Sequence, residues 1–129
     1  MSNRDVREHA SSYFLPLLLG NNSLSHKLSA KILRKYGVES LILDEKRSAY
    51  DILDVSSHFV KLSQTQEPTI LSDELLAIAK SYEYTLPILV PCSEKYIQLI
   101  ATVADELEAE FVICDADEIF TSSPLSSIP

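Results

Sequence analysis

The sequence predicts an α/β domain in three layers, α/β/α, with a mainly parallel sheet of four to five strands. Two observations predict this. Short continuous apolar runs, such as "LPLLL" at 15–19 and "LPILVPC" at 86–92, have the length and composition of strands buried on both faces. Between such runs, apolar residues recur every three or four positions, as they do in amphipathic helices. Alternation of the two implies βαβ units, right-handed crossovers and a parallel sheet.

The totals indicate one soluble globular domain. The chain has 129 residues, of which 46% are hydrophobic and 23% charged, and its formal net charge is −8. That charge argues against a nucleic-acid partner, because binding to the phosphate backbone depends on Lys and Arg. No apolar run approaches the roughly 18 residues that a membrane span needs, and the polar N-terminus lacks the shape of a signal peptide. We therefore expect a cytoplasmic protein that binds neither nucleic acid nor membrane.

The first half of the chain predicts a strand, a helix and a second strand. The apolar run 15–19 is a strand whose start tolerates proline. Ser23 is the expected N-cap of the helix, and Gly37 its C-terminal stop. The segment "VESLILD", 38–44, is the second strand. The apolar stripe of the helix comprises Leu24, Leu28, Ile32, Leu33 and Tyr36.

A connector with some helical content, 45–55, leads to a short third strand, 56–63. A polar loop is expected at 64–69, followed by a helix capped by Ser72 or Asp73. Its apolar side comprises Leu75, Leu76, Ala79 and Tyr82.

The last third predicts a buried strand at 86–92, a helix capped by Ser93 and a final strand at 110–114. The residues expected on the apolar stripe of that helix are Tyr96, Ile97, Ile100, Ala104 and Leu107. Residues 1–13 are expected to form an N-terminal tail, and 121–129 a linker.

These elements together predict a Rossmann-like domain over residues 14–120. In such a sheet, ligands bind beyond the carboxyl ends of the strands. The residues expected to face that cleft are Gly20, Asn21, Asn22, Ser23, Cys92, Ser93 and Glu94.

Glycine content limits what the turn "GNNS" can bind. The chain contains only Gly20 and Gly37, which excludes both a dinucleotide fingerprint and a P-loop, because each needs several glycines. Free N–H groups at a helix start and the Asn amides could instead hold an anion or a carbonyl. The alternative is an ordinary turn, in which Asn tolerates a left-handed backbone and Ser caps the helix.

No residue is predicted to be catalytic or to bind a metal. Cys92 precedes a helix, where a thiol pKa can fall, but no Cys/His signature places a base beside it among His9, His26 and His58. Cys92 is more simply a small residue at a strand end, and Asp44 an acid that ends a strand. The acidic clusters around 105–110 and 115–118 lack the glycine and regular ligands of a calcium loop, which favours solvated faces.

Three segments in this order resemble one family. "LLLGNNSLSHKLSAKILRKYGVESLILD" is similar to the opening of ATP-grasp carboligase-type proteins, including carbamoyl-phosphate-synthase-like members. "SSHFVKL" resembles their Ser-Arg-Tyr-Val element, and "LPILVPCSEKYIQLI" their Pro-Thr-Ser-Asp-Glu-Tyr-Val turn. The sequence departs from the family at three positions. Leucine replaces a second glycine beside Gly20, His58 replaces the arginine of the Ser-Arg-Tyr-Val element, and Cys92 replaces the threonine of the later turn.

The resemblance implies a pre-ATP-grasp domain that walls one side of the active-site cleft and helps to hold the acceptor substrate. Such ligases join a carboxylate to an amine or a thiol through an acyl-phosphate. ATP, magnesium and most catalytic residues belong to a downstream ATP-grasp domain, toward which 121–129 would lead. No cofactor is expected in this fragment, which would be inactive by itself. Replacing Asn21 or Asn22 is expected to leave folding nearly intact and to weaken acceptor binding.

The alternative is a stand-alone Rossmann- or flavodoxin-like module that binds a small ligand or a protein without catalysis. A homodimer through the surface that would otherwise meet the missing domain would support it. A receiver domain is a poor version of this alternative, since the turn after the first strand is Gly20-Asn21-Asn22 where a receiver carries acids.

Overall fold

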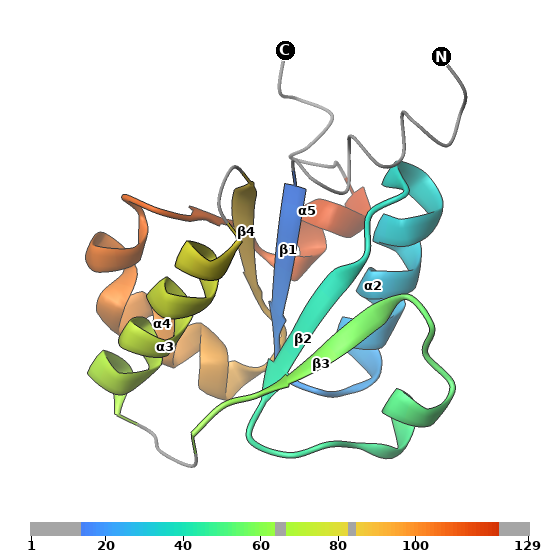
Figure 1. Cartoon of the computed structure of the whole chain (residues 1–129), viewed down its shortest axis with the longest axis horizontal. Helices are drawn as coiled ribbons and strands as arrows, with labels where there is room; N and C mark the ends of the chain where they lie inside the picture. Colours follow the sequence, from blue (N-terminus) through green and yellow to red (C-terminus); the bar gives the residue numbers. More distant parts are fainter. Residues whose placement is uncertain (1–13, 64–66, 83–84, 122–129) are drawn as a thin grey trace.

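The computed structural model describes residues 14–63, 67–82 and 85–121, with the backbone alone for 119–121. Its centre is a five-stranded, all-parallel sheet of order β3-β2-β1-β4-β5 (Figure 1). This confirms the predicted Rossmann-like α/β class. The strands are β1 (Phe14–Leu19), β2 (Ser40–Asp44), β3 (Ser57–Lys61), β4 (Leu86–Pro91) and β5 (Val112–Ile113).

Helices cover both faces of the sheet. Helices α2 (Ser23–Tyr36) and α5 (Ala116–Thr121) lie on one face, whereas α3 (Pro68–Ser81) and α4 (Glu94–Leu107) pack together on the other (Figure 1). The connection from β2 to β3 contains a short 3-10 helix, η1 (Ala49–Ile52), where the sequence predicted some helical content.

Alternation along β1 builds two cores. Leu17 and Leu19 belong to the core under α3 and α4, while Leu18 belongs to the core under α2 and α5. All three side chains are fully buried, and full burial of a leucine stabilises a fold by about 1.5–3 kcal/mol. The continuous apolar run is therefore required by a central strand with helices on both faces.

Helix α2 starts one residue earlier than predicted, because its N-cap is Asn22 and not Ser23. Asn22 Oδ1 accepts from the Ser25 N–H at 3.0 Å, and Ser25 Oγ accepts from the Asn22 N–H at 3.1 Å. Such a reciprocal capping box satisfies two donors at the helix start. The predicted stop at Gly37 is confirmed by its left-handed backbone, with φ of 71°.

Helix α3 begins at Pro68, so the predicted cap at Ser72 or Asp73 is wrong. Proline suits the first helical turn, where its missing N–H has no partner to lose. Ser72 is buried, and its hydroxyl donates to Glu106 Oε2 of α4 at 3.4 Å.

Two expected stripe residues face outward instead. Tyr82 and Ile97 are 42% and 46% exposed, while Leu71 and Val103 are buried in the core. Tyr82 is the C-cap residue just after α3, and in α4 the buried face includes Val103 and not Ile97.

The end of the domain differs from the prediction. The last strand is shorter than 110–114, and the acidic segment after it forms α5, with Asp117 and Glu118 in its first turn. The predicted tail at 1–13 and residues 122–129 of the predicted linker lie outside the described residues. Within the described ranges, no helix has the length and apolar character to cross a membrane.

Candidate ligand-binding edge of the sheet

The carboxyl ends of the strands meet at the lower edge of the sheet in Figure 1. Strands β1 and β4 are neighbours there, yet α2 leaves toward one face and α4 toward the other. Divergence of this kind opens the crevice in which parallel α/β sheets bind ligands. A hollow of about 360 Å³ lies at this point, and its lining includes Pro91, Ser93, Glu94, Ile97, Asp115 and Asp117.

Gly20 makes the close approach of the two turns possible. Its φ is +115°, a backbone conformation that side chains with a Cβ rarely adopt. A Cβ there would lie 3.2 Å from Asn22 Nδ2 and 3.6 Å from the Ser93 side chain. Its N–H donates to the Leu43 carbonyl at 2.8 Å. Glycine is therefore required at the end of β1.

Asn22 fastens the two sides of the crevice together. Its Nδ2 donates across to the Cys92 carbonyl at 3.0 Å, while its Oδ1 caps α2. Both ends of the amide are thus engaged within the protein. The side chain fixes the width of the crevice and leaves little capacity for a ligand.

Ser93 and Glu94 stand at the start of α4, on the other side of the crevice. Ser93 is the N-cap, as predicted, and its Oγ accepts from the Tyr96 N–H at 3.3 Å. Glu94 is exposed, and its Oε1 accepts from Gln98 Nε2 at 3.2 Å. The partly exposed Ser93 hydroxyl and the Glu94 carboxylate are the predicted site groups best placed to meet a ligand.

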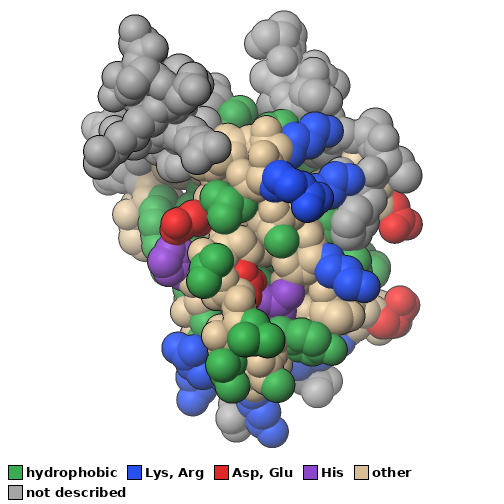
Figure 2. Space-filling view, turned by 90° about the vertical axis from the view of Figure 1, so that its right-hand side faces the viewer, with side chains coloured by type: hydrophobic (Ala, Val, Ile, Leu, Met, Phe, Trp, Pro, Cys, Tyr) green, Lys and Arg blue, Asp and Glu red, His purple; other side chains and the backbone are tan. Residues whose placement is uncertain are grey.

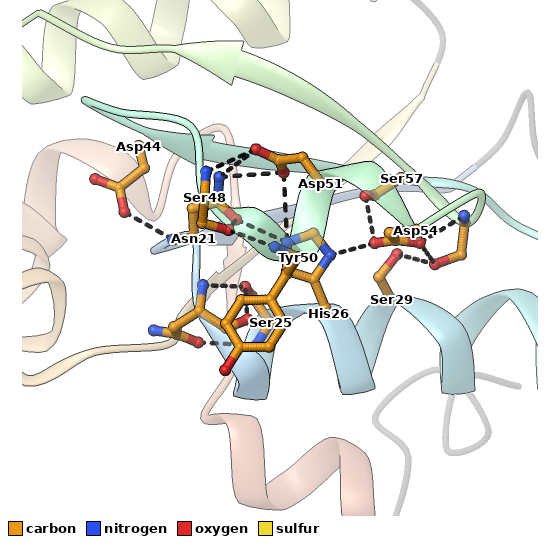
Figure 3. Close-up of polar contacts among 12 residues, drawn as sticks. Asn21, Ser25, His26, Ser29, Asp44, Ser48, Tyr50, Asp51, Asp54 and Ser57 are labelled. Carbon is orange, nitrogen blue, oxygen red and sulfur yellow. Dashed lines mark hydrogen bonds and ion pairs between the residues drawn. The ribbon is translucent and has the colours of Figure 1, made fainter.

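Asn21 points away from the crevice, toward η1 (Figure 3). Its Nδ2 donates to Asp51 Oδ2 at 2.9 Å, and its Oδ1 accepts from Ser48 Oγ at 2.9 Å and lies 2.7 Å from His26 Nε2. Its backbone N–H donates to Asp44 Oδ2 at 2.7 Å. Asn21 therefore holds the β2–β3 connection against the first turn of α2.

His26 continues this network from α2 (Figure 3). Its side chain is only 9% exposed, and its two ring nitrogens face the Asn21 amide oxygen and the Asp54 carboxylate. Asp51 Oδ1 lies 3.5 Å from Nε2. The imidazolium form can donate at both nitrogens. Since Nε2 is directed at an amide oxygen and not at a hydroxyl, this arrangement does not activate a nucleophile. The network of Asn21, His26, Asp51 and Asp54, called the clamp below, is structural.

Asp54 anchors the other end of the clamp. Burial raises the pKa of its carboxyl, but hydrogen bonds from the Ser56 and Ser57 hydroxyls, the Ser56 N–H and His26 outweigh this and lower it from 3.8 to about 2. The Ser57 hydroxyl donates at 2.7 Å. Ser56 also meets Ser29 of α2, with 2.7 Å between the hydroxyl oxygens. The serines of the "SSHFVKL" segment thus fasten the start of β3 to α2.

Asp44 joins β2 to both neighbouring turns. Besides the Asn21 N–H, it accepts from the Tyr96 hydroxyl at 2.9 Å. Burial, that hydrogen bond and the charges of Asp44 and Glu45 raise the pKa of Tyr96. Beside them Lys95 Nζ lies 2.9 Å from Glu45 Oε1. The carboxylate of Asp44 is engaged within the fold, in agreement with the structural interpretation of this acid.

Both cysteines are buried thiols. Burial raises the pKa of Cys92 to about 12, and burial together with the charges of Glu118 and Asp115 raises that of Cys114 to about 11. A thiol in this state is a poor nucleophile at neutral pH. Cys92 contributes the crevice wall and the carbonyl that accepts from Asn22.

An apolar surface lies beside the clamp. Tyr50, Ile52, Leu53 and Val55 in and after η1 are 50–89% exposed. Figure 2 shows hydrophobic side chains gathered on the lower part of this face. A hollow of about 570 Å³ separates Tyr50 and Leu53 from α2, and the exposed Ser23 lies on its α2 side.

The structure therefore divides the predicted site residues. It brings Gly20, Asn22, Cys92 and Ser93 together at the crevice, with Glu94 at its rim, and turns Asn21 and Ser23 toward η1. The described residues contain no cluster of three or more His, Cys, Asp or Glu side chains suited to a metal ion. Neither a protein-family model nor a curated protein matches this chain.

Proposed function

We propose that this chain is the substrate-side domain of an ATP-grasp-type ligase, which joins a carboxylate to an amine through an acyl-phosphate and is inactive without the nucleotide-binding part. The observation that carries the proposal is the meeting of two distant segments at one crevice. The Gly20–Asn22 turn and the Pro91–Glu94 turn, on which the resemblance rests, are joined by the Asn22–Cys92 hydrogen bond of 3.0 Å.

The charge of the crevice favours an amine over a thiol as the acceptor. Among the residues that the structure describes, its lining includes the carboxylates Glu94, Asp115 and Asp117 and no lysine or arginine. Carboxylates at a partly enclosed surface attract ammonium groups and disfavour anionic ligands. The acceptor would enter with its amine toward these groups, while ATP and magnesium would be held by the downstream domain.

The test compares two charge-neutralising variants in the intact protein purified from its native cell. In a ligation assay that follows ADP release, Glu94→Gln should raise the acceptor KM about tenfold, since a charged hydrogen bond contributes about 1.5–3 kcal/mol. The KM for ATP should stay unchanged. Glu108→Gln, at the opposite end of α4, removes the same charge and serves as the control. Equal acceptor KM values in the two variants would argue against the assignment.

The second candidate is a stand-alone interaction module, and the apolar surface around η1 favours it. Ile52, Leu53 and Val55 are each more than 80% exposed, and exposed apolar patches on soluble proteins commonly mark interaction sites. On this alternative the isolated chain forms a homodimer, and Leu53→Asp converts it to a monomer. Sedimentation velocity of both proteins decides the matter, because a monomeric wild-type chain contradicts the homodimer.

A further inference from the structure

A cationic groove lies at the other end of the same sheet edge, where β2 and β3 end. It has a volume of about 520 Å³ and is lined by Glu45, Lys46, Arg47, Phe59 and Lys61. The pairing of Asp44 with Lys61 brings the residues that leave β2 beside the end of β3. Because side chains alternate along a strand, Phe59 and Lys61 point to the same face of the sheet.

The charges of this groove are unbalanced. Glu45, the one acid among the described residues that line it, is already paired with Lys95 at 2.9 Å. Within the part of the chain that the structure describes, Lys46, Arg47 and Lys61 form no ion pair, and all three are exposed. Three uncompensated cations around one hollow are notable in a chain of net charge −8.

The groove is also held in shape by the surrounding structure. The Arg47 guanidinium lies over the Phe59 ring, 4.9 Å from its centroid. The Lys46 carbonyl accepts from Asn21 Nδ2 at 3.4 Å, and the Ser48 N–H donates to Asp51 Oδ2 at 2.9 Å. A fixed loop lowers the entropy that a ligand would lose on binding.

We infer that this groove binds a small polyanion, a ligand whose phosphate or carboxylate groups carry two or more negative charges. Arg47 supplies the planar fork that holds two oxygens of one such group, while Lys46 and Lys61 supply point charges on either side. The size of the hollow and the acidity of the whole chain restrict the ligand to a small molecule. This site is separate from the crevice and does not depend on the ligase proposal.

The test titrates the full chain with tripolyphosphate, inorganic phosphate and citrate, followed by calorimetry and by backbone amide NMR shifts. Binding of tripolyphosphate with shifts at Lys46, Arg47 and Lys61 is expected. Lys61→Glu and Arg47→Gln should each weaken it about tenfold or more, as loss of a charged hydrogen bond does. Lys80→Glu, on the exposed side of α3, changes the net charge as Lys61→Glu does and should leave binding within about twofold.

Each outcome bears on the inference. Tighter binding of tripolyphosphate than of citrate identifies a phosphate ligand, and the reverse order identifies a polycarboxylate; both support the site. Absence of binding by all three probes at millimolar concentration overturns it. Equal weakening by Lys61→Glu and Lys80→Glu also overturns it, because binding would then follow net charge alone. Arg47→Gln keeps the test decisive should Lys61→Glu fail to fold.

Discussion

Asn21 has either a structural role or a substrate-binding role, and the variant Asn21→Ala distinguishes the two. The change removes the amide that donates to Asp51 and faces Ser48 and His26 at 2.7–2.9 Å. One of these partners, the Asp51 carboxylate, is charged, and a charged hydrogen bond contributes about 1.5–3 kcal/mol, whereas a neutral one contributes about 0.5–1.5 kcal/mol. We therefore expect a loss of about 2–4 kcal/mol in the free energy of unfolding, which lowers Tm by roughly 10 °C.

The assay is urea denaturation followed by circular dichroism at neutral pH. Gln98→Ala is the matched control, since its exposed amide donates to Glu94 at 3.2 Å on the surface of α4, and its loss should lower the free energy of unfolding by less than about 0.5 kcal/mol. An Asn21→Ala protein as stable as the wild type would refute the structural reasoning. If acceptor binding then weakened, the sequence-based expectation for Asn21 would be restored.

Three further predictions concern the backbone, the clamp and the thiols. Gly20→Ala should lower the free energy of unfolding by more than about 2 kcal/mol, because the φ of +115° and the 3.2 Å approach to Asn22 add strain. The comparison is Gly37→Ala, at an ordinary left-handed cap, which should lower it by about 1 kcal/mol. Equal losses in the two variants would contradict the packing argument. The lowered pKa of Asp54 stabilises the fold above pH 3.8, and that stability is lost as pH falls toward about 2. Asp54→Asn should remove this pH-dependent contribution to the free energy of unfolding, roughly 1–1.5 kcal/mol after solvent screening. Identical pH profiles of the urea midpoint for variant and wild type would count against it. Cys92 should resist iodoacetamide at pH 8 in the folded chain and react in urea, as mass spectrometry can show; rapid native labelling would mean that the thiol is not buried.

The strands were the most predictable part of this fold. Leu17–Leu19 and residues 87–91 are buried on both faces, so nearly every position must be apolar, and that requirement is visible in a single sequence. Helix starts were less predictable because several polar residues compete as caps. Asn22 outcompetes Ser23 since its amide can also reach the Cys92 carbonyl, 70 positions away in the sequence.

The clamp around His26 could not be predicted from periodicity. Its partners Asn21, Asp51 and Asp54 lie 5 to 28 positions from it, and hydrogen bonds between loops leave no regular spacing. One local signal exists, because Ser48 and Asp51 form a capping box that marks the start of η1. Proline at the first turn of α3 was a second available signal.

The proposed ligase chemistry is tested most directly by isotope transfer in the intact protein from its native cell. A carboxylate labelled with ¹⁸O would attack the γ-phosphorus of ATP and release ADP, and the amine would then displace phosphate that carries one former carboxylate oxygen. Across a panel of amino acids offered as carboxylate and amine with Mg²⁺, the account predicts ADP release that needs both substrates and ¹⁸O in the inorganic phosphate. ADP release without transfer of the label, or none with any pair, would contradict it.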